Sequence, residues 1–224
     1  MEAYFTLILF PLLIGIWAQI KIHSKYTQWS QVRSSKGLRG VDAAAAVMEQ
    51  AGIHDVEIVC IEGKLTDHYD PVHRRLALSR DNYNGTSLAA LGVAAHEAGH
   101  AIQHKEAYKP LKLRSALIPI TNFSCQILPF VLMGGFLMNL FGLIKLAVFI
   151  YLILTVFQLI TLPVEFDASA RAKKLLLNLS IIDSNESVGV CETLNAAAFT
   201  YVAAFIASLG QLMYYLMLSQ RRND

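Results

Sequence analysis

The chain has 224 residues, of which 54% are hydrophobic and 16% are charged, with a formal net charge of +2 and a mean hydropathy of +0.43. This composition is too apolar for an ordinary soluble domain and favours a membrane protein. The basic residues form no stripe interleaved with aromatic side chains, which excludes nucleic acid as a partner. The widely spaced cysteines Cys60, Cys125 and Cys191 show no disulfide or metal-site spacing, and we expect them to be buried apolar residues.

Four apolar runs predict membrane-spanning helices, because a hydrocarbon core of about 30 Å requires roughly 20 residues of helix. These runs cover residues 3–20, 116–138, 143–162 and 196–218. The first run follows Glu2 and precedes several basic residues, which is typical of an uncleaved anchor and not of a signal peptide. The second and third runs predict a hairpin that turns at 139–142.

Four spans place residues 21–114 and 163–195 on the same side of the membrane, as one soluble lobe. Lysines and arginines near the span ends concentrate on this side, which predicts the cytosolic side of the plasma (inner) membrane. Arg221 and Arg222 follow the last span and argue against this orientation. We expect residues 1–224 to form a single domain.

The lobe begins with an alanine-rich predicted helix that ends near Gly52, a residue suited to a helix C-terminus. Two β-type runs, 56–63 and 74–79, predict a small sheet, and a turn-rich segment, 65–71, separates them. Ser87 is then the predicted N-terminal cap of a helix that extends to about residue 106. The predicted fold is an α+β membrane protein with about four transmembrane helices and a mainly helical, zincin-like lobe that carries a small β-sheet.

This last helix carries the sequence HEAGH, from His96 to His100. Histidines at i and i+4 lie on one helix face, one turn apart, where both imidazoles reach a single Zn²⁺. A catalytic zinc has three protein ligands and an open position for water. Glu97 lies next to the first ligand in sequence, and we expect it to be the general base.

The third ligand has to come from another part of the chain. His104 lies about 12 Å along the helix axis from His96, which is too far for both to bind one metal ion. Gln103 stands where a metzincin has glycine, which excludes the metzincin class. The HEAGH segment lies outside the predicted spans, which disfavours an intramembrane protease. Glu165 is the remaining carboxylate, just after the third span, where we expect an alanine-rich helix to begin. The first turn of a helix also favours a solvated glutamate.

The segments GKLTDHYDP, RRLALS, VAAHEAGHAIQH and LPVEFDASARA together resemble the YugP-like neutral zinc metallopeptidases of bacterial membranes, over about residues 37–211. The order HEAGH, membrane hairpin, EFDA is also similar to gluzincins of the HtpX and CAAX-prenyl-protease type, in which that glutamate is the third ligand. The resemblance therefore implies Glu165 as a ligand. Those relatives have an aspartate where this chain has Ser169, so Ser169 and Asp167 are candidates for orienting His96.

These observations predict an integral membrane zinc metalloendopeptidase that hydrolyses peptide bonds with a zinc-bound water activated by Glu97. In the segment 65–71, His68 and Tyr69 are candidates for contacting the transition state or the substrate, and the neighbouring aspartates are expected to bind local backbone amides. The run 74–79 is expected to bind an extended substrate as an edge strand.

The expected partners are the lipid bilayer and a membrane-associated protein or peptide substrate, with a membrane protein or a second copy of the chain as further options. Two other functions stay open. One is a membrane scaffold or chaperone-like protein with a structural or vestigial zinc site. The other is a zinc-dependent amidohydrolase or lipid hydrolase, since HExxH does not identify the bond that is cleaved.

Overall fold

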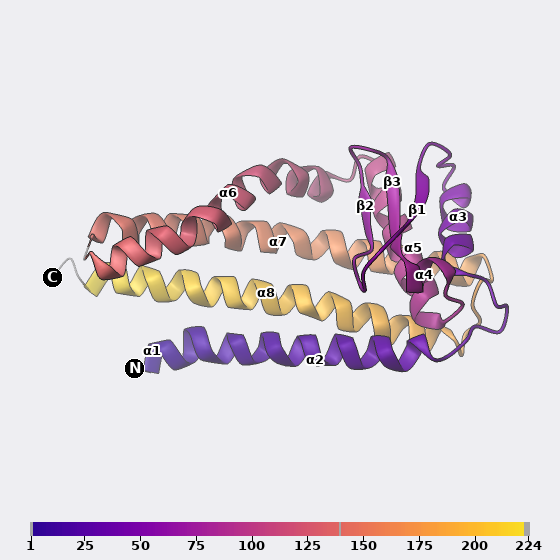
Figure 1. Ribbon diagram of the computed structural model, residues 1–224, viewed down its shortest axis with the longest axis horizontal. Helices are drawn as coiled ribbons and strands as arrows, with labels where there is room; N and C mark the ends of the chain where they lie inside the picture. Colours follow the sequence, from indigo (N-terminus) through magenta and orange to yellow (C-terminus); the bar gives the residue numbers. More distant parts are fainter. Residues whose placement is uncertain (1, 139, 222–224) are drawn as a thin grey trace. The chain divides into compact units, whose positions relative to one another are not determined.

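The computed structural model of the protein describes residues 2–138 and 140–221. Helices dominate, and the lobe contains one small sheet (Figure 1). The elements are α1 (Glu2–Tyr4), the π-helix η1 (Phe5–Leu9), α2 (Phe10–Ser30), α3 (Gly40–Gln50), β1 (Glu57–Ile61), β2 (His68–Asp70), β3 (Arg75–Ser79), α4 (Arg80–Asn84), α5 (Leu88–Lys105), α6 (Lys109–Leu137), α7 (Phe141–Asn178) and α8 (Ser187–Arg221). The predicted α+β class is confirmed.

Within the described residues, four helical segments are long and apolar enough to cross a membrane: Glu2–Ser30, Lys109–Leu137, Phe141–Asn178 and Ser187–Gln220. Their number agrees with the sequence prediction, but the helices continue beyond the predicted runs. The predicted turn at 139–142 includes Asn139, which lies outside the described residues, as does Arg222.

The expectation that a new helix begins near Glu165 is wrong, because α7 is continuous and Glu165 lies inside it. Pro163 does not end this helix. A single proline removes one backbone hydrogen bond and can be accommodated in a longer helix with a local kink. Glu165 is therefore a mid-helix residue and is 2% exposed, so the interpretation of a solvated glutamate in a first turn is also wrong.

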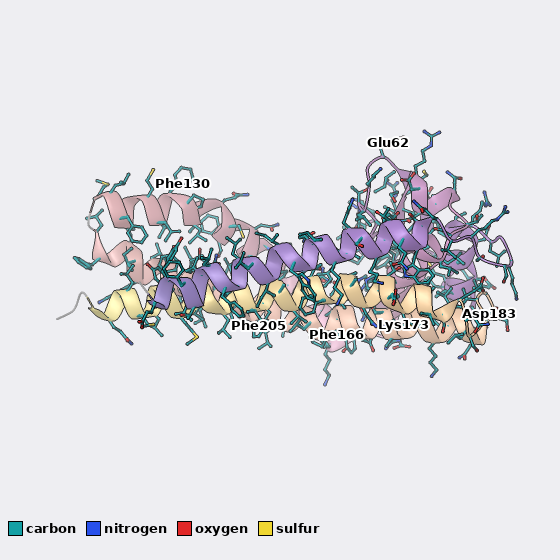
Figure 2. The ribbon with its side chains drawn as sticks, turned by 90° about the horizontal axis from the view of Figure 1, so that it is seen from below. Glu62, Phe130, Phe166, Lys173, Asp183 and Phe205 are labelled. Carbon is teal, nitrogen blue, oxygen red and sulfur yellow. The ribbon has the colours of Figure 1, made fainter. Side chains whose placement is uncertain are left out.

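The described residues form two compact units. The first comprises residues 2–19, 112–163 and 200–221 and contains most of the apolar helical surface. Within it, the rings of Tyr151 and Tyr215 stack at a centroid distance of 5.0 Å. Phe130 lies on the outside of α6 and is 69% exposed (Figure 2). Large exposed apolar side chains on such helices are typical of a lipid-facing surface.

The second unit comprises residues 20–111 and 164–199 and holds the sheet and α5. Helix α5 packs against α3 and against the sheet (Figure 1). The core of this unit combines leucine, isoleucine and valine side chains with alanines, of which Ala43, Ala44, Ala94, Ala95, Ala98 and Ala172 are completely buried. Gly52 has a φ of +65° and follows the end of α3, as predicted.

The sheet has the strand order β1-β3-β2, with β1 parallel and β2 antiparallel to β3. Strand β3 is therefore central, and the prediction that residues 74–79 form an edge strand for substrate is wrong. Leu76 and Leu78 are completely buried, and both backbone edges of β3 already pair with neighbouring strands. Strand β2 lies in the segment that the sequence predicts as a turn.

Asp67, which precedes β2, and Asp70, its last residue, behave differently. Asp70 accepts hydrogen bonds from the amides of Val72 and His73, as predicted. Asp67 accepts from the amide and the hydroxyl of Ser79 and from the side-chain amide of Asn82. These partners of Asp67 are distant in sequence, so it links β3 and α4 to the loop and does not close a local turn.

The prediction of buried cysteines is also wrong, since Cys60 and Cys125 are exposed and Cys191 is half-buried. Cys60 lies on the edge strand β1, where successive side chains point to opposite faces of the sheet. Cys125 lies on α6, one of the four helices able to cross a membrane. An apolar residue on such a helix can face lipid instead of a protein core.

Candidate metal centre

Helix α5 presents the HEAGH segment from a capped N-terminus. The Ser87 hydroxyl accepts a hydrogen bond from the amide of Ala90 at 3.2 Å, which is the predicted cap. Nine residues after this cap, His96 emerges on the same helix face as His100, with their ring centroids 4.8 Å apart. The helical spacing of His96 and His100 therefore places their imidazoles next to each other in the lobe.

Glu165 reaches these imidazoles from α7. Its Oε2 lies 3.2 Å from Nε2 of His96 and 3.7 Å from Nε2 of His100. The three side chains offer ligand atoms that all lie within 4.8 Å of one another. In the described part of the chain, this is the one group of three or more histidine, cysteine or acidic residues with such spacing.

The donor set fits zinc. Metal–ligand distances of about 2.0–2.1 Å in a tetrahedral site place ligand atoms about 3.3 Å apart. The separations of 3.2 Å and 3.7 Å from Glu165 to the two imidazoles lie on either side of that value. Two imidazoles and one carboxylate form a common ligand set of catalytic zinc sites, whereas Ca²⁺ and Mg²⁺ prefer oxygen ligands alone. The role of the three residues as ligands stays a prediction.

His96 has a partner for its other ring nitrogen. Its Nδ1 lies 3.1 Å from the hydroxyl oxygen of Ser169, so that Nε2 is the nitrogen that faces Glu165. Of the two candidates for this contact, the structure therefore places Ser169 beside the ring. Asp167 instead accepts a hydrogen bond from Nε2 of Gln103 at 2.8 Å. Since a hydroxyl can donate or accept, Ser169 restricts the tautomer of His96 less than a carboxylate would.

His100 has a partner that the sequence analysis missed. Its Nδ1 lies 3.0 Å from Oε1 of Gln103, which is three residues further along α5. In the sequence, Gln103 served only to exclude a metzincin. The i, i+3 spacing was a signal for this contact, because residues three apart are neighbours on a helix surface.

Glu97 is a buried carboxylate, 8% exposed, next to His96 in sequence. It is not part of the cluster of three ligand atoms. Burial alone would lower the pKa of His100, but the hydrogen bond with Glu165 and the charge of Glu97 outweigh burial, and the pKa is raised. The negative charges of Glu97 and Glu165 act on His100 and would also favour a bound cation.

The two predicted substrate-contacting residues lie on β2. The hydroxyl of Tyr69 is hydrogen-bonded to Nδ1 of His104 at 2.8 Å, in the last turn of α5, and burial together with the charge of Asp70 raises the pKa of Tyr69. His68 is exposed, and its Nδ1 lies 2.8 Å from the carbonyl oxygen of Thr66. Neither residue belongs to the candidate metal group, and their roles at the transition state stay predictions.

Two helices that bring two histidines and a glutamate together, with a further glutamate buried beside them, define a candidate zinc hydrolase site. Comparison with known proteins agrees with this class. The family described as "Putative neutral zinc metallopeptidase" matches residues 4–220, and the chain belongs to this family.

The chain is also similar to a protein whose name states an activity. The chain is 41% identical over 211 residues to a Bacillus subtilis (strain 168) protein named "Putative membrane protease YugP", and the match covers 94% of each chain. No solved structure matches. The predicted resemblance is confirmed, and the chain is a member of a zinc metallopeptidase family with four helices able to cross a membrane.

Proposed function

We propose that the protein is an integral membrane zinc metalloendopeptidase in which His96, His100 and Glu165 bind the metal and Glu97 is the general base. The observation that carries this proposal is the group of three ligand atoms within 4.8 Å of one another, formed by two histidines of α5 and by a glutamate of α7 that lies at least 65 positions from them in sequence. Family membership supports the reaction class, and the apolar helices support the membrane setting.

The residues of the site divide the chemistry between them. When bound, zinc supplies Lewis acidity, which lowers the pKa of a water molecule and polarises the scissile carbonyl. Glu97 takes the proton from the attacking water and passes it to the leaving amine, since it is a buried carboxylate that directly follows His96 in sequence and is not one of the three candidate ligands. Ser169 holds the ring of His96 through Nδ1.

A structural zinc site usually has four protein ligands, whereas a catalytic site has three and keeps a position open for water. The described residues supply a group of three, with a buried glutamate next to it. This arrangement, together with membership of a peptidase family, favours hydrolysis over a scaffold with a structural zinc ion.

The expected substrate is a protein or peptide that reaches the site at the membrane. The relative from Bacillus subtilis carries the name of a membrane protease, which supports a peptide bond as the target over a lipid ester or other amide. We place the lobe on the cytosolic side of the plasma membrane, following the distribution of basic residues.

The test uses the full chain reconstituted in lipid vesicles with a fluorescent casein or peptide-library substrate. Glu97→Gln should keep its zinc and lose at least about 100-fold in cleavage rate, because a general base contributes roughly that much. The exposed Glu62 provides the matched control, and Glu62→Gln should cleave at the wild-type rate. Wild-type cleavage by Glu97→Gln would overturn the assignment, and turnover of phospholipid but not peptide would favour a lipid hydrolase.

A further inference from the structure

Gln103 is a large polar side chain that is completely buried. Both the nitrogen and the oxygen of its side-chain amide form hydrogen bonds with residues at or next to the candidate metal centre. Its Nε2 donates to the carbonyl oxygen of Val164 and to the carboxylate of Asp167, each at 2.8 Å, and its Oε1 lies 3.0 Å from Nδ1 of His100. Burying an amide is costly unless it is hydrogen-bonded, and here each polar atom has a partner.

These contacts determine the orientation of the amide. A carbonyl and a carboxylate accept hydrogen bonds and cannot donate them, so the nitrogen of Gln103 must face Val164 and Asp167. The oxygen of Gln103 must then face His100, and Nδ1 of His100 carries the hydrogen that it donates. Nε2 of His100 is left with its lone pair, on the side of Glu165.

The same glutamine connects the two helices that supply the ligands. Val164 directly precedes Glu165, so the hydrogen bond to its carbonyl lies one residue from the third candidate ligand. The connection continues at Asp167, which also accepts a hydrogen bond from Nε of Arg171 at 2.6 Å. Arg171 in turn donates to Glu106, at the end of α5, at 2.7 Å.

We propose that Gln103 is a positioning residue, which fixes the tautomer of His100 and holds the Glu165 segment of α7 against α5 so that both side chains bind one zinc ion. This inference rests on the proposed function. If Gln103 served only to fill space, an apolar side chain of similar size could replace it. The three hydrogen bonds of its amide instead indicate a positioning role.

The test measures zinc affinity of the full chain in detergent by competition with a chelator, alongside the thermal stability of the zinc-free protein. Gln103→Leu removes all three hydrogen bonds and should lower zinc affinity about 10- to 100-fold, the usual effect of losing a partner of a metal ligand. Asn82 is the matched control, since it is also a buried amide of the lobe. Asn82→Leu should lower stability and leave zinc affinity unchanged.

A second pair of variants covers the case in which Gln103→Leu does not fold. Gln103→Glu keeps an acceptor for His100 but places two carboxylates together, and it should weaken zinc binding. In the double variant with Asp167→Asn, the asparagine amide can donate a hydrogen bond to the new glutamate at position 103. This variant should recover most of the lost zinc affinity. Equal zinc affinity in wild type, Gln103→Glu and the double variant would overturn the inference. Absence of zinc from the wild type would instead overturn the proposed function itself.

Discussion

Gly99 of α5 faces the backbone of Ala168 on α7 so closely that a Cβ at Gly99 would lie 2.8 Å from the carbonyl oxygen of Ala168. Both partners of this contact belong to helix backbones, which do not move as readily as a side-chain tip. Gly99 lies between His96 and His100 in sequence, and Ala168 lies three residues after Glu165. The close approach therefore occurs where the two helices supply the candidate ligands.

We expect Gly99→Ala to push α5 and α7 apart. Overpacking of this kind costs about 1–3 kcal/mol of unfolding free energy. The thermal unfolding midpoint of the zinc-free protein should fall, and zinc affinity should fall with it, as measured by chelator competition. Gly142→Ala is the control, because a Cβ at Gly142 meets nothing within 4 Å. Unchanged zinc affinity in Gly99→Ala would contradict the importance of this contact.

Removal of the Ser169 hydroxyl should weaken the metal site without unfolding the lobe. Ser169→Ala takes away the partner of His96 Nδ1, and we expect zinc affinity to fall about 10-fold or more. Ser208→Ala removes the hydroxyl of another buried serine, which donates to the carbonyl of Phe205 on its own helix. The two variants should differ in zinc affinity, and identical affinities would argue against an orienting role for Ser169.

Local sequence patterns predicted the elements that depend on neighbouring residues. Ser87 caps α5 and Gly52 follows α3 because both effects operate within a few residues. The i, i+4 spacing of HEAGH likewise follows from helix geometry alone. The position of Glu165 just after the third span made it a candidate and the resemblance implied it as a ligand, and the structure brings it to the two histidines.

Most of the features that were missed depend on contacts between distant segments. The central place of β3 follows from pairing with strands on both sides, and no pattern within residues 74–79 reveals it. The bonds from Gln103 to α7 cross about sixty positions of sequence. Cys60 is exposed because β1 lies at an edge of the sheet, which depends on the same strand order.

The exposed Cys60 offers a direct test of the predicted orientation. In a chain with Cys125→Ser and Cys191→Ser, Cys60 is the remaining cysteine, and it lies in the same unit as the candidate metal site. A membrane-impermeant maleimide should label it in inside-out vesicles and not in intact cells, because we place the lobe in the cytosol. The further variant Cys60→Ser should give no label. Labelling of intact cells would show that the lobe faces the outside.

The most direct test of the account is the zinc content of the purified full chain, measured by mass spectrometry after dialysis against a weak chelator. Glu165→Ala removes the buried carboxylate that lies beside both imidazoles, whereas Glu62→Ala removes an exposed one. We predict about one zinc ion per chain in the wild type and in Glu62→Ala, and little or none in Glu165→Ala. Retention of a full zinc equivalent by Glu165→Ala would contradict a site built from His96, His100 and Glu165.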